Sequence, residues 1–336
     1  MLYGPVRLMR RRDVLRGVAA SAPSLILPSR VVAQVSRSKP ARVAFLTASS
    51  SRRTYLLAAL RRGLAEAGYV EGENLLLEAR FAENQPDKMP ALVAELLTWQ
   101  PDVIVASGTT AALAVREASS TVALVFAAVS TPKLLGLSDI RPRLGQRSTG
   151  LTSQNTDLVA KRVDLLKELV PGLRYAAFVY HREDISNVAS ARLLMSGEVT
   201  SGLQLKVLSF GDADEAKRVL EEARASGAEA ALVGSGLTVG FYVPIADVAT
   251  RLRLPTLASE RSYPEQGGLS SYATNFADQL RRAAFYVDRI LKGAAPETMP
   301  IEQPTSFEFI INMRTARALG IDVAPALVAR ASELIE

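Results

Sequence analysis

The segment at residues 101–110, PDVIVASGTT, contains the local unit that the chain repeats. Val103, Ile104 and Val105 predict a buried parallel strand, and the small residues after them begin an alanine-rich helix. Such a helix presents free backbone N–H groups and the positive end of its dipole beside the strand. We therefore interpret residues 107–110 as one wall of a ligand-binding site. A capped turn without a ligand has the same local pattern, so this interpretation depends on repetition elsewhere.

Strand and helix patterns alternate along most of the chain, and helical stripes of Leu and Val lie between the apolar runs. The first set of predicted strands is at residues 41–46, 74–80, 103–105 and 123–126. The same order begins again after Gly150. The second set is at residues 175–180, 203–209 and 230–233. A repeated βαβαβ order predicts two similar lobes with parallel sheets.

The last section of the chain is too short for a third domain. An extended run at 269–274, a striped helix around Leu280 and a strand at 307–312 therefore complete the two sheets. We predict an α/β fold with two Rossmann-like, doubly wound parallel-sheet lobes joined by a three-crossover hinge, which encloses a cleft for a small polar ligand. The first lobe is predicted at residues 40–150 plus 270–303, and the second at residues 151–269 plus 304–336.

The formal net charge of +6 is concentrated at the N-terminus. Residues 1–39 contain eight basic residues and one acid, which gives +7 and leaves −1 for the rest of the chain. A nearly neutral body has no excess of basic residues for a phosphate backbone. We therefore expect no nucleic-acid partner.

Residues 1–39 have the three parts of an export signal. A basic start precedes an apolar stretch at 14–27, and the sequence VVA ends at Ala33, near which we predict cleavage. The run RRDVLR at residues 11–16 resembles a twin-arginine motif. We predict export to the periplasm; the alternative is a basic tail on a cytosolic protein. The sequence has no cysteine, which excludes disulfides, thiolate metal sites and a lipid-anchored N-terminal cysteine, so the exported protein is predicted to be soluble.

The turns expected to face the cleft are rich in hydroxyl groups and backbone donors. Four of their residues are arginines, and a planar guanidinium suits a ligand carboxylate. These arginines are Arg52, Arg53, Arg182 and Arg261. The candidate ligand-binding residues are Ser49, Ser50, Ser107, Gly108, Thr109, Thr110, Ser130, Thr131, Tyr180, Ser235, Arg261 and Tyr272.

His181 is the only histidine, and we interpret it as a solvated turn residue because a catalytic base or a metal site needs further groups. The sequence GSG at 234–236, followed by Gly240, suggests a dinucleotide loop. Its spacing is one residue too long, and Pro244 is expected to disturb the following helix. Phosphate-loop, nucleophile-elbow and zinc-ligand patterns do not occur in the sequence. We therefore predict no catalytic residue, no metal ligand and no cofactor.

Five stretches of sequence show a specific family resemblance. They are LRRGLAEAGYVEGENLLLEARFAENQPDKMPALVAELL, PDVIVASGTTAAL, RVDLLKELVPGL, GGLSSYATN and RILKGAAPETMPIEQPTSFEFIINMRTARALGI. Together they resemble the substrate-binding proteins of ABC transporters, in the family that includes tryptophan- and phenylalanine-binding members. The resemblance implies a type I periplasmic-binding fold. It also implies capture of a small polar or aromatic solute, such as an amino acid, and its delivery to a membrane permease. We expect a monomer.

The chain departs from this family pattern in the predicted site. Thr131-Pro132 stands where Asp-Pro is usual, and residues 180–183 replace a turn rich in Asn-Pro. The aspartate usual near Gly236 is also missing. Losing acids removes partners for a ligand ammonium group, so the resemblance leaves the identity of the ligand open.

Two other function classes use similar lobes. A sugar-nucleotide epimerase or glycosyltransferase closes two Rossmann-like lobes on its ligand, but it needs charged catalytic side chains and a diphosphate site. A ligand-sensing regulator needs a helix-turn-helix before residue 40, where the basic segment instead has the features of an export signal. The sequence therefore favours a solute receptor that performs no chemistry.

Overall fold

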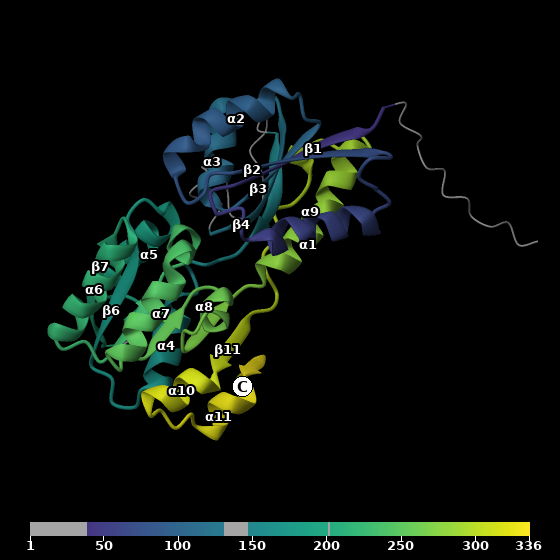
Figure 1. The fold of residues 1–336 in the computed structure, drawn as a ribbon. Coiled ribbons are helices and arrows are strands. Elements are labelled where there is room, and N and C mark those ends of the chain that lie inside the picture. The colour runs from purple at the N-terminus through teal and green to yellow at the C-terminus, as the bar shows by residue number, and fades with distance from the viewer. Residues whose placement is uncertain (1–38, 131–146, 201) are drawn as a thin grey trace, which may run out of the picture. The chain divides into compact units, whose positions relative to one another are not determined.

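The computed structural model describes residues 39–130, 147–200 and 202–336 (Figure 1). The described residues form one compact unit. The predicted export signal with its cleavage site near Ala33 lies outside the described residues, and so does Thr131. In the described part of the chain, every helix is too short or too polar to cross a membrane.

The first sheet contains five parallel strands in the order β2-β1-β3-β4-β5. Its strands are β1 (Ala41–Thr47), β2 (Leu75–Phe81), β3 (Val103–Ser107), β4 (Ala123–Val129) and β5 (Ser148–Thr152). The helical elements between them are α1 (Thr54–Glu66), η1 (Pro86–Lys88), α2 (Met89–Thr98) and α3 (Thr109–Ala118). Successive residues of β1 point to opposite faces, and apolar side chains cover both faces, as expected for a doubly wound parallel sheet.

The second sheet contains seven strands in the order β12-β11-β10-β9-β8-β6-β7. Its strands are β6 (Tyr175–His181), β7 (Gln204–Phe210), β8 (Ala230–Val233), β9 (Thr256–Ala258), β10 (Ser270–Ala273), β11 (Glu308–Asn312) and β12 (Glu333–Ile335). Its helical elements are α4 (Val159–Leu169), α5 (Ile185–Met195), α6 (Ala213–Ala225), η3 (Gly236–Phe241), α7 (Tyr242–Arg251), α8 (Ser262–Glu265), α10 (Met313–Leu319) and α11 (Pro325–Arg330). The order β7-β6-β8-β9-β10 repeats the order of the first sheet, and only β10 and β11 pair antiparallel among the described strands. The predicted fold class of two parallel-sheet lobes is confirmed.

The chain passes between the two sheets three times. It leaves the first sheet after β5, returns after β10 to form α9 (Phe276–Leu291) and η4 (Pro296–Thr298), and leaves again before β11.

One predicted boundary between the lobes is wrong. Residues 270–273 were expected in the first lobe, but they form β10, which pairs with β9 and β11 in the second sheet. The run is short, with the sequence SSYA, and has no apolar alternation, so its pattern does not show which sheet it joins.

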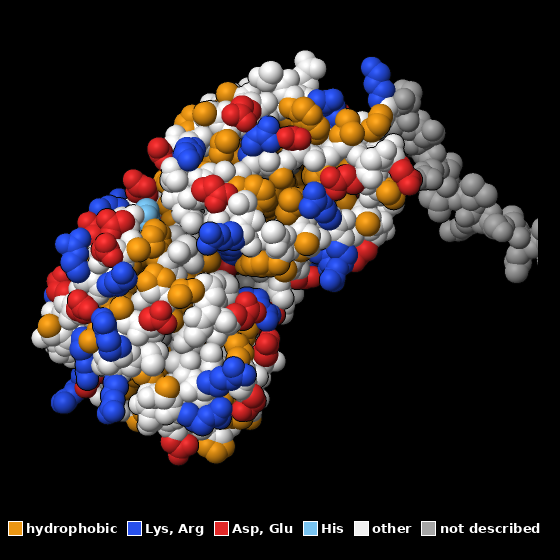
Figure 2. Space-filling model, viewed as in Figure 1, with side chains coloured by type: hydrophobic (Ala, Val, Ile, Leu, Met, Phe, Trp, Pro, Cys, Tyr) orange, Lys and Arg blue, Asp and Glu red, His pale blue; other side chains and the backbone are white. Residues whose placement is uncertain are grey.

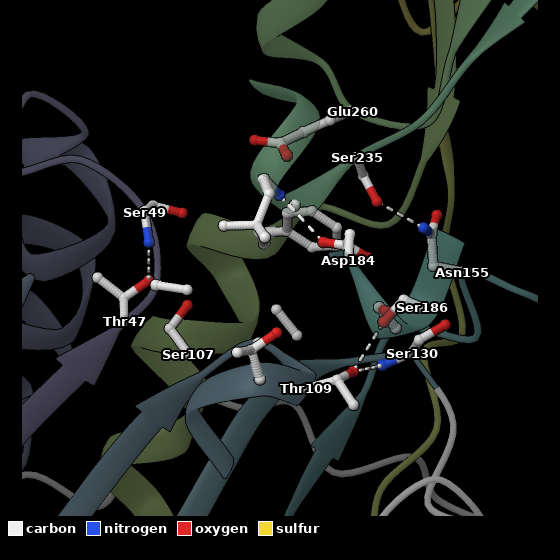
Figure 3. A pocket seen from close by; sticks show the side chains of 18 of the residues that line it. Thr47, Ser49, Ser107, Thr109, Ser130, Asn155, Asp184, Ser186, Ser235 and Glu260 are labelled. Atoms are coloured by element: carbon white, nitrogen blue, oxygen red, sulfur yellow. Dashed lines mark hydrogen bonds between the residues drawn. The ribbon is translucent and has the colours of Figure 1, made fainter. Parts of the chain in front are cut away.

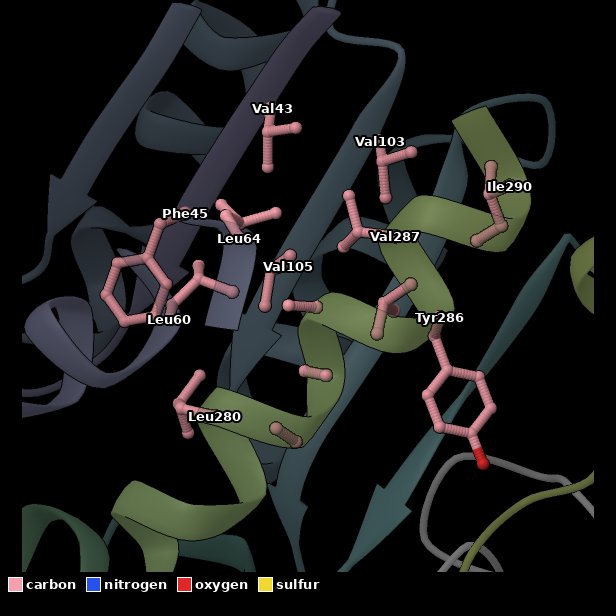
Figure 4. Close-up of a cluster of buried hydrophobic side chains, with 14 of the residues drawn as sticks. Val43, Phe45, Leu60, Leu64, Val103, Val105, Leu280, Tyr286, Val287 and Ile290 are labelled. Carbon is pink, nitrogen blue, oxygen red and sulfur yellow. The ribbon is translucent and has the colours of Figure 1, made fainter. Parts of the chain in front are cut away.

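Helix α9 supplies much of the core of the first lobe although it lies far from that lobe in sequence. Figure 4 shows Leu280 and Val287 on α9 facing Val105 and Val103 of β3, with Leu60 of α1 beside them. The helix begins at the N-cap Asn275, whose side chain accepts a hydrogen bond from the backbone N–H of Asp278. Burial of the apolar side chains of α9 against the first sheet therefore holds this returning segment in the first lobe.

The crossing of α1 and α9 requires a glycine. A Cβ atom at Gly63 would lie 2.0 Å from the carbonyl oxygen of Arg281 and 2.9 Å from Cβ of Ala284. The two backbones approach too closely for any side chain at this position.

Charged side chains of both signs are interspersed on the outer face shown in Figure 2.

We expect Gly63→Ala to lower the free energy of unfolding by about 1–3 kcal/mol, because the added methyl group forces α1 away from α9. Urea denaturation followed by circular dichroism measures the change. Ala65→Leu adds bulk to the exposed side of the same helix and is the control, with an expected change within about 0.5 kcal/mol. Equal stability of Gly63→Ala and the control would contradict the close approach.

Candidate ligand-binding site

A pocket lies where the carboxyl ends of strands from both sheets meet (Figure 3). It encloses about 580 Å³, including its opening to solvent. Most of its lining is small and polar. The lining residues are Thr47, Ala48, Ser49, Arg53, Leu56, Ser107, Gly108, Thr109, Thr110, Ala128, Ser130, Ser153, Asn155, Asp184, Ser186, Ser235, Gly236, Leu237, Glu260 and Phe276.

The first-lobe wall is formed by the N-terminus of α3. Gly108 is its N-cap residue, with a φ of 91°, and no side chain caps the helix. A positive φ favours glycine, and the first N–H groups of a helix have no acceptor within that helix. The Thr109 hydroxyl accepts hydrogen bonds from the backbone N–H of Ser130 at 3.1 Å and from the Ser186 hydroxyl at 2.9 Å. This wall is thus suited to an anionic group.

The second-lobe wall contains the buried carboxylate of Asp184. Its Oδ1 accepts from the backbone N–H of Asn187 at 2.9 Å, and its Oδ2 accepts from the backbone N–H of Leu237 at 3.0 Å. Burial raises the pKa of Asp184. A Cβ atom on Gly236 would lie 2.0 Å from Oδ2, so glycine is required there. The carboxylate therefore fixes the turn after β8 against the start of α5.

Glu260, which follows β9, forms an ion pair across the pocket with Arg53 at the start of α1. The Tyr55 hydroxyl donates to the same carboxylate oxygen, Glu260 Oε1, at 3.0 Å. Arg53 also donates to the Ser49 hydroxyl at 3.0 Å. Glu260 is only 1% exposed, so this pair joins the two lobes in a protected environment.

Comparison with known proteins identifies the family. Residues 47–335 match the family model described as ABC transporter substrate binding protein. The chain belongs to this family of substrate-binding proteins.

Three similar proteins extend this result. A tyrosine-binding protein from Clostridioides difficile strain R20291 is 19% identical over 260 residues, which cover 77% of this chain and 75% of that protein. A conserved domain protein from Vibrio cholerae O1 biovar El Tor has a structure with a TM-score of 0.80 and 25% identity, over 88% of this chain and 100% of that one. An ABC domain from Streptococcus pneumoniae in complex with L-Trp has a structure with a TM-score of 0.78 and 21% identity, over 88% of this chain and 100% of that one.

In this substrate-binding protein, Arg162 of α4 joins two of the segments that connect the lobes. It is 3% exposed and donates from its Nε to the carbonyl oxygen of Tyr272 at 2.8 Å. It also donates to the carbonyl oxygen of Asn155 at 2.8 Å, and the Asn155 amide donates to the Ser235 hydroxyl in the pocket at 2.7 Å. Burial lowers the pKa of Arg162 to about 9, so the guanidinium stays charged at neutral pH. The hinge and the pocket are therefore connected by hydrogen bonds.

Seven of the candidate ligand-binding residues line the pocket, and their contact with a ligand stays a prediction. They are Ser49, Ser107, Gly108, Thr109, Thr110, Ser130 and Ser235. Each of the seven lies at or just after the carboxyl end of a parallel strand. This is the edge at which open parallel sheets generally bind their ligands.

Four other candidates lie outside the pocket. The Ser50 hydroxyl donates to Glu83, and the Tyr180 ring stacks on Phe178 at 5.2 Å. Arg261 forms ion pairs with Glu265, Glu308 and Glu333. The Tyr272 ring packs beside Phe307 at 5.9 Å and the ring of Phe309. These four side chains contact neighbours within their own lobes. Such contacts cannot be predicted from the position of a residue in a turn.

Two further expectations are wrong. His181 was interpreted as solvated, but it is 3% exposed, stacks on Phe241 at 5.6 Å, and its Nε2 lies 3.1 Å from the carbonyl oxygen of Gly211. Pro244 was expected to disturb a helix, but it lies in the first turn of α7, where a missing N–H costs nothing. Among the described residues, no group of three or more His, Cys, Asp or Glu could hold a metal ion.

Three residues of the site, Asp184, Glu260 and Asn155, were not predicted from the sequence. Asp184 had a local signal, because an aspartate directly before a helix is a common N-cap. Of the four arginines in predicted cleft turns, Arg53 is the one that lines the pocket, whereas the side chain of Arg182 pairs with Glu215. Glu260 had no distinctive local signal, since its role depends on a contact between residues 207 positions apart.

We expect Arg162→Met to lower the free energy of unfolding by about 2–4 kcal/mol, because it leaves the carbonyl oxygens of Asn155 and Tyr272 buried without a donor. Arg192→Met, on the exposed side of α5, is the matched control and should change stability by at most about 0.5 kcal/mol. Chemical denaturation of both variants measures the difference. Similar losses of unfolding free energy in the two variants would show that the hinge contacts of Arg162 do not contribute to stability.

Proposed function

We propose that this protein is an extracytoplasmic solute receptor of an ABC importer. It captures a small polar molecule that carries a carboxylate, with an amino acid as the leading candidate, and delivers it to a membrane permease. The observation that supports this most directly is the pocket at the carboxyl ends of both sheets, with an uncapped helix N-terminus in its wall. The related proteins named for tyrosine and solved with L-Trp support the choice of an amino acid.

The carboxylate of the ligand binds at the start of α3. Gly108, Thr109 and Thr110 line the pocket, and their part of the helix offers backbone N–H donors and the positive end of the helix dipole. Both effects favour a negative group, and the flanking hydroxyls of Ser49 and Ser107 add further donors.

The acids missing from the usual family positions do not leave the pocket without acidic side chains. Asp184 and Glu260 both line it, and both are at most 5% exposed. The loss of Asp-Pro at residues 131–132 therefore does not argue against an amino-acid ligand.

Binding and release occur by hinge motion between the lobes. The Ser186 hydroxyl contacts Thr109 across the pocket, and Glu260 contacts Arg53, so the structure has contacts that a closed receptor needs. Opening breaks these contacts, and closing surrounds the solute with backbone dipoles and hydroxyls. Such a cycle returns the solute unchanged and requires no catalytic group or cofactor.

Export to the periplasm completes the proposal. It is supported by the signal-like pattern of residues 1–39 and by the family of the chain. The partners are the solute and the permease, with the receptor acting as a monomer. Membership of a substrate-binding family favours this function over the epimerase, glycosyltransferase and regulator alternatives.

Isothermal titration against the twenty amino acids, a set of sugars and a set of nucleosides tests the receptor function. Saturable binding of one compound, which mass spectrometry then recovers unaltered, is the expected result. Conversion of the bound compound into a product would contradict the proposal, and so would failure to bind any member of the three sets.

We expect Gly108→Ala to weaken binding of the compound found in that titration by about tenfold, because a residue with a side chain resists the positive φ and turns the first N–H groups of α3 away. Gly197→Ala is the matched control, because Gly197 also has a positive φ, with open space around it and a position outside the pocket. The control should lose stability without losing affinity. An equal loss of affinity in both variants would exclude a specific role of the α3 N-terminus.

A further inference from the structure

His181 is the last residue of β6 and the single histidine of the sequence. Its ring stacks on Phe241 of η3 with 5.6 Å between the ring centroids, and it meets Phe210 of β7 edge-on at 5.7 Å. The residue is 3% exposed and does not line the pocket. A titratable ring is thus held between two aromatic side chains, in a place where it makes no direct contact with a solute.

The hydrogen bonds of the ring fix its protonation state. Its Nε2 lies 3.1 Å from the carbonyl oxygen of Gly211, which can only accept a hydrogen bond, so Nε2 carries the hydrogen. The backbone N–H of Glu183 donates to Nδ1 at 3.3 Å, so Nδ1 carries none. Both contacts are satisfied only by the neutral ring. A proton on Nδ1 would place one N–H against another and break the contact with Glu183.

The turn that this ring holds is part of the pocket wall. It contains Asp184, which lines the pocket (Figure 3) and accepts a hydrogen bond from the backbone N–H of Leu237 in η3. The backbone N–H of His181 also donates to the hydroxyl of Thr238 in η3 at 3.0 Å. A movement of residues 181–184 is therefore transmitted to the second-lobe wall.

The charged groups packed around the ring come from its own turn and from α6. Arg182 pairs with Glu215, and the same oxygen of Glu215 accepts from the backbone N–H of Gly211 at 2.8 Å, so two opposite charges offset each other beside Nε2. The Asp212 carboxylate caps α6. The Glu183 side chain is exposed, and the residues of η3 are not titratable. The acids of α6 are thus engaged with partners of their own.

Asp184 is the acid that a protonated ring attracts. Burial raises the pKa of Asp184, and the nearby ring of His181 acts against this rise. Both Asp184 oxygens accept from backbone N–H groups, from Asn187 at 2.9 Å and from Leu237 at 3.0 Å. A positive charge on the ring competes with these donors for the carboxylate. Protonation therefore loosens the turn at two contacts, the one with the N–H of Glu183 and the one with the N–H of Leu237.

We propose that His181 makes solute binding depend on pH, with the neutral ring holding the second-lobe wall in its binding form and the protonated ring releasing it. The inference rests on the proposed receptor function. Histidine is the side chain that ordinarily changes charge between about pH 5 and about pH 8. Because the neutral ring supports binding, affinity is highest above the pH at which the ring titrates and falls as the pH decreases through it.

The test measures affinity as a function of pH on the purified, untagged protein. The probe is the amino acid, sugar or nucleoside that binds most tightly at about pH 7.5, and calorimetry follows its affinity down to about pH 5. We expect the affinity to fall about tenfold while the binding stoichiometry stays constant. The amino and carboxyl groups of a free amino acid keep their charges over this range, so the change originates in the protein.

Nuclear magnetic resonance follows the ring itself, because a single histidine gives one set of imidazole signals. The ring should gain its proton over the pH range in which affinity falls. The backbone amide signals of Glu183 and Leu237 should shift with the same midpoint. This measurement needs no substitution, and a ring that stays neutral down to about pH 5 overturns the inference.

Three variants assign the effect to the ring. His181→Gln keeps an N–H donor but cannot gain a proton, and its affinity should change by less than about twofold over the same range. His181→Phe keeps a ring between Phe241 and Phe210, and the same flat profile is expected from it if the glutamine variant does not fold. Glu229→Gln is the matched control, because it removes an acid outside the pocket, beside Tyr175 at the other end of β6, and should keep the wild-type pH dependence.

The outcomes distinguish failure of this inference from failure of the proposed function. Wild-type affinity that does not change with pH overturns the inference but retains the receptor function. A pH dependence that persists in both His181 variants belongs to another group, such as Asp184, and also overturns it. A falling stoichiometry at constant affinity indicates acid unfolding and has the same consequence. Absence of saturable binding to every compound overturns both the inference and the receptor function.

Discussion

Parallel pairing of β1, β3 and β4 places the carboxyl ends of all three strands on one edge of the first sheet. The repeated strand order of the second sheet produces an equivalent edge in the other lobe. Pocket residues follow from this arrangement, since Ser107 ends β3, Ser130 follows β4 and Ser235 lies just after β8. Short polar turns at these strand ends leave backbone donors exposed to a ligand rather than to another core element.

The chemistry of the pocket comes from polar groups that the protein does not satisfy internally. The start of α3 has no side-chain cap, and Glu260 Oε2 has no donor in the described structure. By contrast, Asp184, Asn155 and Arg162 form hydrogen bonds within the protein and fix the turns and hinge segments around the site. A rigid frame around an uncapped helix N-terminus is suited to a small ligand that carries an anionic group.

Much of the architecture was predictable, because the alternation of apolar runs and helical stripes repeats over both lobes. The pattern also placed α9 and β11 correctly as completing elements, but it assigned β10 to the wrong lobe, since a four-residue run with the sequence SSYA fits either sheet. In the site, the rule on strand ends selected serines and threonines that line the pocket, and their contact with a ligand stays a prediction. Tyr180, Arg261 and Tyr272 lie outside the pocket because their long side chains reach partners within their own lobe, and His181 has a ring buried between aromatic neighbours.

The secondary-structure order, the duplication, the family and the positions of the turns at the sheet edges could be predicted from the amino-acid sequence, because these depend on local periodicity and on neighbours along the chain. Which charged groups meet became known only from the folded arrangement. Arg53 and Glu260 come together through the approach of two lobes, and Arg162 reaches Asn155 and Tyr272 through the folding of the hinge. The contacts of Arg53 with Glu260 and of Arg162 with Tyr272 join residues far apart in the sequence, and their strength depends on burial, which no local pattern records.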